Sequence, residues 1–344
     1  MAKTAVILMN LGAPDHLDAV QPFLTNLFSD PAILNFRVPS FVRKTLARII
    51  ARRRTPFAKE IYEQLGGQSP LYKNTILQSD ALQKLLGDDF DLHIAMRYWH
   101  PRAEDIIEKL KKNPPDQIVL LPLYPQFSTT TTGSSVNEWM DLQRKADLDI
   151  PVHYICCYPE DKGFVSAQAA LLEDTLRANQ GSIPYRVLFS AHGLPKRIVD
   201  GGDPYPKHVE LTARAIVDLL DQPSLDWRVC YQSRVGPVEW IKPYADDEIR
   251  LAGREGVSVI LVPLSFVSEH SETLIELDVE FKKIADASGV PLYLRVPTVG
   301  VAPSYIENLK DLVFQALVES PLSISPKSTL CKKCISPCKG AYCA

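Results

Sequence analysis

The chain has 344 residues, 46% of them hydrophobic and 23% charged, which is the composition of a globular protein with room for about two domains. Its net charge of −3 does not indicate a nucleic-acid partner, so any electrostatic signal must be local. No segment has the ~18 consecutive apolar residues that a transmembrane helix needs. The first residues turn at Gly12 and Pro14 without a cleavage site, so we predict a core strand, no signal peptide and a cytoplasmic protein.

Apolar runs typical of strands alternate with helical patterns along the chain. The expected strands are 4–10, 90–96, 117–123, 151–156, 185–190, 226–232, 257–262 and 291–296. Helical patterns separate most of them, for example at 73–86, 102–112, 162–178, 206–221 and 302–319. This alternation predicts an α/β protein with parallel sheets flanked by helices. No glycine-rich nucleotide motif is present, so the class alone does not predict a nucleotide site.

Two stretches resemble each other: IVLLPLYPQFS (118–128) and VILVPLSFVS (259–268). Each has a strand, then Pro-Leu, an aromatic residue and a serine, which predicts two similar α/β halves of mostly four strands each; chance similarity of two apolar strands is the alternative. We place the N-terminal domain at 1–160 and the C-terminal domain at 161–301, followed by a helix at 302–320 that packs back on the body and a cysteine-rich tail at 321–344. The loops at the carboxyl ends of the two sheets would then face a shared cleft.

An acidic segment, PLSFVSEHSETLIELDVEF (263–281), follows a buried strand and contains no Lys or Arg. In a helix that starts near His270, Glu272 and Glu276 share one face and repel each other by roughly 0.2–0.5 kcal/mol. Either this face is solvated, or it meets a cation. Carboxylates with an imidazole suit a divalent metal such as Fe²⁺.

Other candidate segments also lie at strand ends or on helices. His192 follows an apolar strand and precedes Gly193, which suits a general base or a metal ligand as well as an ordinary loop histidine. The hydroxyl-rich loop at 124–139 could bind an anion or supply helix caps. The segment 41–54 combines six basic residues with an apolar stripe, a pattern of helices that lie on anionic membranes or pack on their own domain.

Several long segments, taken together and in this order, resemble the ferrochelatases, which insert Fe²⁺ into protoporphyrin IX. They are ILMNLGAPD (7–15), GGQSPL (66–71), RYWHP (97–101), PLYPQFSTTTTGSS (122–135), FSAHGLPKRIVDGGDPYP (189–206), YQSRVGPVEW (231–240) and PLSFVSEHSETLIELD (263–278). The resemblance extends to about residue 320. It implies two Rossmann-like domains with the porphyrin in the cleft between them.

The resemblance assigns site residues by position. The family's active-site histidine falls on His192 and its glutamate on Glu272, as catalytic groups or ligands of the substrate Fe²⁺. An acidic path behind them would comprise His270, Glu276 and Asp278, and the porphyrin pocket would be lined by Tyr124, Arg97, Tyr98, Trp240 and Leu11. Our hypothesis is that His192 accepts pyrrole protons while Glu272 guides metal or protons. The two would face each other across a crevice wide enough for a tetrapyrrole.

The tail contains cysteines in the pattern C-x2-C-x3-C-x4-C: Cys331, Cys334, Cys338 and Cys343. Animal ferrochelatases hold a [2Fe–2S] cluster with three tail cysteines and one in the hydroxyl-rich loop, where this chain has Thr129. Cys343 would therefore be the fourth ligand, with Cys156 or Cys157 as a less favoured source. A zinc site or free thiols are the alternatives.

The sequence leaves several alternative functions open. The substrate could be coproporphyrin III, the reaction could be Co²⁺ insertion into a corrin precursor, or the protein could be a haem or iron carrier without turnover. Gln64 stands where animal relatives have Arg, which removes one expected contact to a propionate. The segment 41–54 suggests peripheral contact with the inner membrane, because porphyrin and haem are poorly soluble.

Overall fold

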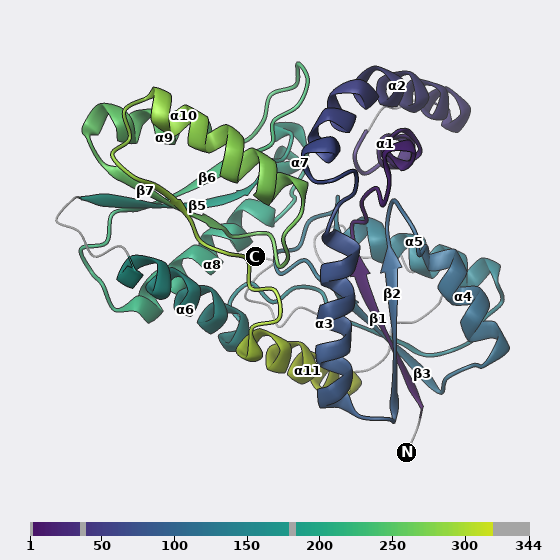
Figure 1. Ribbon diagram of the computed structural model, residues 1–344. Helices are drawn as coiled ribbons and strands as arrows, with labels where there is room; N and C mark the ends of the chain where they lie inside the picture. The colour runs from purple at the N-terminus through teal and green to yellow at the C-terminus, as the bar shows by residue number, and fades with distance from the viewer. Residues whose placement is uncertain (1–2, 35–38, 179–183, 319–344) are drawn as a thin grey trace. The chain divides into compact units, whose positions relative to one another are not determined.

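The computed structural model describes residues 3–34, 39–178 and 184–318 (Figure 1). They form two compact units, which we call unit 1 and unit 2. Of the described residues, unit 1 comprises those up to Cys156 and those from Leu309 to Val318, and unit 2 comprises those from Cys157 to Asn308.

Unit 1 is built on a fully parallel four-stranded sheet with the order β2-β1-β3-β4. The strands are β1 (Thr4–Asn10), β2 (Phe90–Met96), β3 (Gln117–Pro122) and β4 (Val152–Tyr154). All of β1 is buried, as expected for an apolar strand with neighbours on both edges. The helices are α1 (Val20–Ser29, after a short 3-10 turn at Leu17–Ala19), α2 (Ser40–Gln64), α3 (Leu71–Leu86), α4 (Ala103–Lys112) and α5 (Thr132–Lys145).

Unit 2 repeats this plan with the order β6-β5-β7-β8, again parallel throughout. Its strands are β5 (Tyr185–His192), β6 (Trp227–Gln232), β7 (Ser258–Pro263) and β8 (Tyr293–Arg295). The helices are α6 (Lys162–Ala178), α7 (Lys196–Asp200), α8 (Tyr205–Leu220), α9 (Ala245–Glu255), the π-helix η2 (Glu272–Phe281) and α10 (Lys282–Ala287). The last helix, α11 (Pro303–Val318), begins in unit 2 and ends in unit 1.

The two similar stretches of the sequence hold equivalent places in the two sheets. Strand β3 lies beside β1 and places Pro122 opposite Met9, while β7 lies beside β5 and places Pro263 opposite Ser190. Because proline lacks the N–H that a ladder needs, each strand ends there and its loop starts at the carboxyl edge of the sheet. The predicted class, α/β with two four-stranded parallel sheets, is confirmed. The edge strands β4 and β8 are shorter than predicted.

Helix α2 is long and amphipathic, and its small residues face inward. Ala47, Ala51 and Thr55 are buried, and Ala51 belongs to an apolar cluster that also contains Val20 and Phe23 of α1. Small side chains let two helices approach closely. The opposite face of α2 is solvent-exposed, including Phe41, which is 71% exposed.

Candidate active site

His192 is the last residue of the central strand β5 in unit 2. The parallel register places it opposite Gln232, the last residue of β6. Gly193 follows, and its N–H donates to the Gln232 carbonyl at 2.9 Å. A Cβ at Gly193 would lie 2.9 Å from that oxygen and 3.1 Å from Trp240 Cε3, so the close approach needs glycine. The chain can therefore leave the strand without moving the imidazole away from β6.

Glu272 begins the π-helix and binds His192 directly. The His192 Nδ1 atom lies 3.0 Å from Glu272 Oε2, and both side chains remain partly exposed. Both groups belong to unit 2. The expected crevice between them is wrong, because a tetrapyrrole does not fit between hydrogen-bonded atoms. Any ring must instead approach the pair from one side.

The electrostatics of this pair favour an imidazolium and a carboxylate. Burial alone would lower the pKa of His192, but the charge and hydrogen bond of Glu272 outweigh it and the pKa lies above its usual value. Burial alone would raise the pKa of Glu272, but His192 holds that pKa far below the usual range. In the resting state the shared proton therefore resides on the imidazole.

Glu276 lies one turn further along the π-helix and is held by donors from the end of β6. Ser233 donates its backbone N–H to Oε1 at 2.8 Å and its hydroxyl to Oε2, while Gln232 Nε2 donates to Oε2 at 3.0 Å. Burial, followed by the charge of Glu272, raises the pKa of Glu276 to about 7. Two neighbouring carboxylates thus differ in how readily they ionise.

The remaining members of the predicted acidic path divide into two groups. His270 Nε2 lies 3.8 Å from Glu272 Oε2, and its ring meets that of Phe266 at a tilt of 49° with centroids 4.6 Å apart. Asp278 is bound in a bidentate fashion by Arg295, at 2.6 and 2.7 Å, and Arg295 also pairs with Glu269. The structure therefore brings His270 to the His192–Glu272 pair and commits Asp278 to an ion pair.

Trp240 lies next to His192 in unit 2. The two rings meet edge to face with centroids 6.4 Å apart, and Trp240 Nε1 donates to the Val235 carbonyl at 3.0 Å. Trp240 is only half-buried, so part of this residue beside His192 stays accessible.

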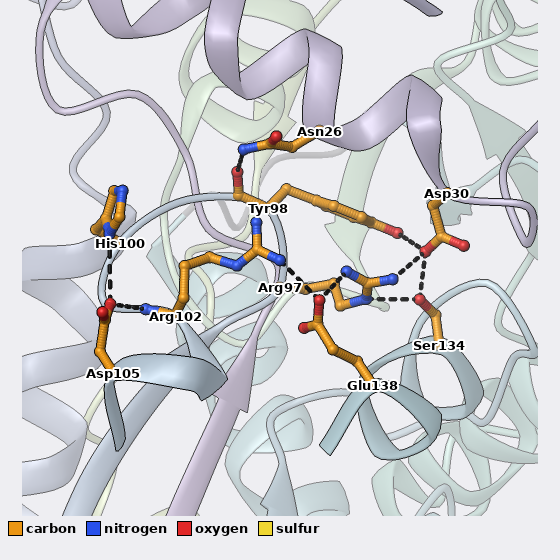
Figure 2. Close-up of polar contacts among 9 residues, drawn as sticks. All are labelled: Asn26, Asp30, Arg97, Tyr98, His100, Arg102, Asp105, Ser134 and Glu138. Carbon is orange, nitrogen blue, oxygen red and sulfur yellow. Dashed lines mark hydrogen bonds and ion pairs between the residues drawn. The ribbon is translucent and has the colours of Figure 1, made fainter. Parts of the chain in front are cut away.

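Figure 2 shows the surroundings of Arg97 and Tyr98 in unit 1. The Arg97 guanidinium donates to Ser134 Oγ at 2.8 Å, to Glu138 Oε1 at 2.7 Å and to Asp30 Oδ2 at 2.8 Å. Tyr98 is fully buried and donates its hydroxyl to the same Asp30 oxygen at 2.7 Å. The network joins the end of α1, the loop after β2 and the first turns of α5.

The other two predicted porphyrin contacts also lie in unit 1. Leu11 is half-buried, and its carbonyl accepts from the Tyr98 N–H at 2.9 Å. Tyr124 is half-buried, and burial of its hydroxyl raises the pKa of that group. Both follow strands at the carboxyl edge of the sheet, where open α/β sheets bind ligands.

The sequence reasoning left several polar residues without a role, above all Asp30, Glu138 and Ser233. Ser233 lies inside a quoted segment, YQSRVGPVEW, so its place beside two strand ends was available as a signal. Asp30 lies in the LFSDP sequence after an apolar helix, but nothing in the sequence connects it to Arg97, 67 residues away.

Within 3–34, 39–178 and 184–318, no group of three or more His, Cys, Asp or Glu side chains has the geometry to hold a metal ion. None of the helices in these ranges is both long and apolar enough to cross a membrane. Cys331, Cys334, Cys338 and Cys343 lie outside the described residues.

Two parallel sheets of one strand order, with an imidazole–carboxylate pair at the end of a buried strand, define an α/β protein with a candidate acid–base site. The fold is similar to that of SirB from Bacillus subtilis with Fe³⁺, with a TM-score of 0.53 and 13% identity over 91% of this chain and 95% of that chain. A cobalt complex of the sirohydrochlorin chelatase SirB from B. subtilis subspecies spizizenii gives the same TM-score at 12% identity, over 93% of this chain and 100% of that chain. This likeness shows the fold alone.

The sequence comparisons are more specific. The sequence model of the ferrochelatase family matches residues 3–317. The chain is 44% identical to a ferrochelatase of Pelagibacter ubique, over 91% of each chain, and 45% identical to one of Caulobacter vibrioides, over 94% of this chain and 93% of the relative. The chain belongs to the ferrochelatase family, and its activity is the insertion of iron into a porphyrin in the last step of haem synthesis.

Proposed function

We propose that Fe²⁺ is inserted into protoporphyrin IX beside the His192–Glu272 pair of unit 2. The supporting observation is the 3.0 Å bond between His192 Nδ1 and Glu272 Oε2, in a pair that keeps some exposure next to the half-buried Trp240. Insertion must remove two pyrrole protons. The site therefore needs a base that is oriented and whose charged form is stabilised.

The bond to Glu272 gives His192 this role. With Nδ1–H donated to the carboxylate, the neutral imidazole presents Nε2 as the proton acceptor, and the imidazolium that forms stays paired with Glu272. Nε2 has no hydrogen-bond partner among the described residues, so in the neutral form of His192 its lone pair is available to the substrate. Glu272 and Glu276, with His270 beside them, provide negative charge toward which a dication moves.

The test is anaerobic Fe²⁺ insertion by His192→Ala with protoporphyrin IX and with coproporphyrin III, the alternative substrate. We expect the wild type to prefer protoporphyrin IX and the variant to lose at least ~100-fold in kcat, the range for removal of a general base. A His192→Ala enzyme with the full insertion rate would refute the assignment of His192 as the base. A wild-type preference for coproporphyrin III would correct the substrate alone.

The roles of the unit 1 residues follow from their contacts. Tyr98 is fully buried and the three donor nitrogens of Arg97 are occupied, so we assign these two residues to support of the loop after β2. Leu11, Tyr124 and, in unit 2, Trp240 retain the proposed contact with the porphyrin. Apolar contact along the ring periphery can stabilise a bent macrocycle.

We also propose that α2 contacts an anionic membrane surface, which would make the protein cytoplasmic and peripheral to the inner membrane. Its exposed apolar side chains are Phe41, Val42, Ile49 and Phe57, with exposures of 71%, 37%, 47% and 54%. Its basic side chains from 41 to 54 form no ion pair with an acid among the described residues: Arg43, Lys44, Arg48, Arg52, Arg53 and Arg54. Each basic residue near an anionic surface contributes about 1 kcal/mol.

Flotation with phosphatidylserine-containing liposomes tests this contact. Replacing Arg52, Arg53 and Arg54 with Ser should reduce the bound fraction, and Phe41→Ser should reduce it independently of charge. The matched control replaces three exposed arginines on other helices, Arg144, Arg177 and Arg214, so that net charge changes equally. Equal losses in both triple variants would reduce the effect to net charge and refute an α2 surface.

For the tail we propose a [2Fe–2S] cluster on Cys331, Cys334, Cys338 and Cys343, with zinc as the alternative. The spacing of the four tail cysteines supports it. An anaerobic absorbance spectrum with iron and zinc analysis decides between the metals. Cys343→Ser should bleach the spectrum while Cys157→Ser leaves it unchanged, and a colourless zinc protein would refute the iron cluster.

A further inference from the structure

Ser233 occupies a position that connects three parts of the site. It directly follows β6, whose last residue is level with His192, so Ser233 emerges beside the imidazole. Its φ is +64°, and its N–H donates to the Glu276 carboxylate of the π-helix instead of to the sheet ladder. The N–H and the hydroxyl both donate to the Glu276 carboxylate, and the hydroxyl oxygen lies 3.4 Å from Glu272 Oε2.

The backbone conformation shows what the side chain adds. A left-handed φ is costly for a residue with a Cβ and nearly free for glycine. Glycine would offer the same N–H to Glu276 at lower conformational cost. The hydroxyl is the one functional group that serine contributes here, and it faces both carboxylates of the π-helix.

The surroundings of Glu276 explain why a positioning group is needed. Glu272 and Glu276 are like charges one turn apart, and repulsion favours their separation. A cavity of about 160 Å³, lined in part by Ser233, Arg234 and Asp246, opens on Glu276. Without its hydrogen bonds to Gln232 and Ser233 at the end of β6, the Glu276 side chain would be repelled by Glu272, and the cavity would give it space to turn away.

Gln232 contributes from the same strand end. Its Nε2 donates to Glu276 at 3.0 Å, while its Oε1 accepts from the Ser190 hydroxyl at 2.7 Å, which fixes the orientation of the amide. Gln232 is nearly fully buried and rigid, whereas the Ser233 hydroxyl can rotate between two acceptors. Ser233 is therefore the adjustable member of this set.

We propose that Ser233 is a positioning residue for iron insertion: its hydroxyl holds the Glu276 carboxylate beside Glu272, so that the two acids act together on the incoming dication. This inference rests on the roles proposed above for Glu272 and Glu276. Ser233 itself touches neither substrate.

The decisive variant is Ser233→Gly. It removes the hydroxyl, keeps the N–H donor and relieves the positive φ, so thermal stability should not fall. We expect kcat/KM for Fe²⁺ to drop about tenfold, as for loss of a hydrogen bond to a charged group, with KM for porphyrin within about twofold. The dissociation constant for Fe²⁺ alone, measured anaerobically, should rise by a similar factor. Ser233→Asn, which tolerates the left-handed φ and offers an amide donor in place of the hydroxyl, should recover part of the loss.

Two comparisons make the result specific. Asp221, at the end of α8, also has a positive φ of 49°, and Asp221→Gly relieves it without an expected change in activity. Glu272→Gln and Glu276→Gln test the underlying roles. If both of these impair insertion and Ser233→Gly stays within twofold of the wild type, the positioning role is refuted while the acids keep theirs.

Other outcomes also contradict the inference. A loss in Ser233→Gly that accompanies a lower thermal midpoint would reduce the residue to a structural role. A loss in Ser233→Gly with full activity in Glu276→Gln would mean that the serine acts through another group. Full activity in all three variants would refute both the proposed acids and Ser233.

Discussion

At the scale of single residues, the proton on His192 governs the chemistry. Glu272 keeps the imidazole in place through Nδ1, but its charge also retains the proton that catalysis must remove. A base with a raised pKa accepts a pyrrole proton more readily once it is neutral. At a given pH, however, a smaller fraction of His192 is neutral. The pair therefore balances the basicity of His192 against the fraction of it that can accept a proton.

This balance predicts the pH dependence of insertion. Protonated His192 accepts nothing, so kcat/KM should fall as the pH drops through the pKa of His192, which lies above the usual ~6.5. Glu272→Gln removes the charge that raises this pKa, so the acid limb of the profile should move to lower pH while kcat falls about 100-fold. The measurement is the initial rate of anaerobic insertion from pH 5 to 9.

Asp286→Asn is the matched control for this prediction. Asp286 lies on α10, 59% exposed and paired with Lys282, so its loss should leave the profile unchanged. An acid limb that stays in place in Glu272→Gln would show that another group titrates.

At the scale of residues, the sequence identified which residues form the site better than it predicted the distances between them. His192 and Glu272 were identified through motifs, yet the 3.0 Å bond between them depends on how the loop after β7 packs across β5, which no local pattern records. Asp278 was expected in the acidic path, but its partner is Arg295, which lies in an edge strand 17 residues later. Only tertiary packing joins these two residues, so the sequence pattern does not predict their pairing.

At the scale of elements, the π-helix η2 is the feature that the sequence pattern concealed. A four-residue spacing of acids is compatible with an α-helix, and the wider π-helix keeps Glu272 and Glu276 on the side of Ser233. π-Helical turns occur frequently at functional sites. The strands were easier to predict, because continuous apolar runs such as 117–123 and 257–262 allow few alternatives in a parallel sheet.

The hydrogen-bond network around Asp30 connects separate elements, so its loss should destabilise the fold. Asp30 accepts from Arg97, Tyr98 and Ser134, which belong to the loop after β2 and to α5. Asp30→Ala leaves a guanidinium that is 14% exposed without one partner, so the free energy of unfolding should fall by about 3 kcal/mol. Denaturant unfolding followed by circular dichroism measures this change.

Asp141→Ala serves as the control because that carboxylate makes an exposed pair with Arg144, 60% and 48% exposed. Such pairs contribute ~0–1 kcal/mol. Equal effects of the two substitutions would show that the Asp30 network adds no more than a surface ion pair.

At the scale of the whole molecule, α11 is the element shared by the two units. Its first part belongs to unit 2, where Tyr305 is fully buried against Phe164 at a centroid distance of 6.0 Å. Its second part belongs to unit 1, where Phe314 meets Phe90 edge to face and the Ala316 carbonyl contacts His153 Nδ1 at 2.9 Å. Neither unit contains its complete core without this helix.

A truncation series should therefore separate the helix from the tail. A chain that ends at Val318 keeps every described residue, whereas one that ends at Asn308 loses buried Leu309, Leu312 and Val313 from unit 1. At roughly 1.5–3 kcal/mol for each buried aliphatic side chain, the loss is on the order of 6 kcal/mol, comparable with the whole stability of a typical domain. The shorter chain should unfold at a much lower denaturant concentration or fail to fold. Equal midpoints for the two chains would contradict a structural role of α11 in unit 1, because the cysteine tail is absent from both and cannot mask the difference.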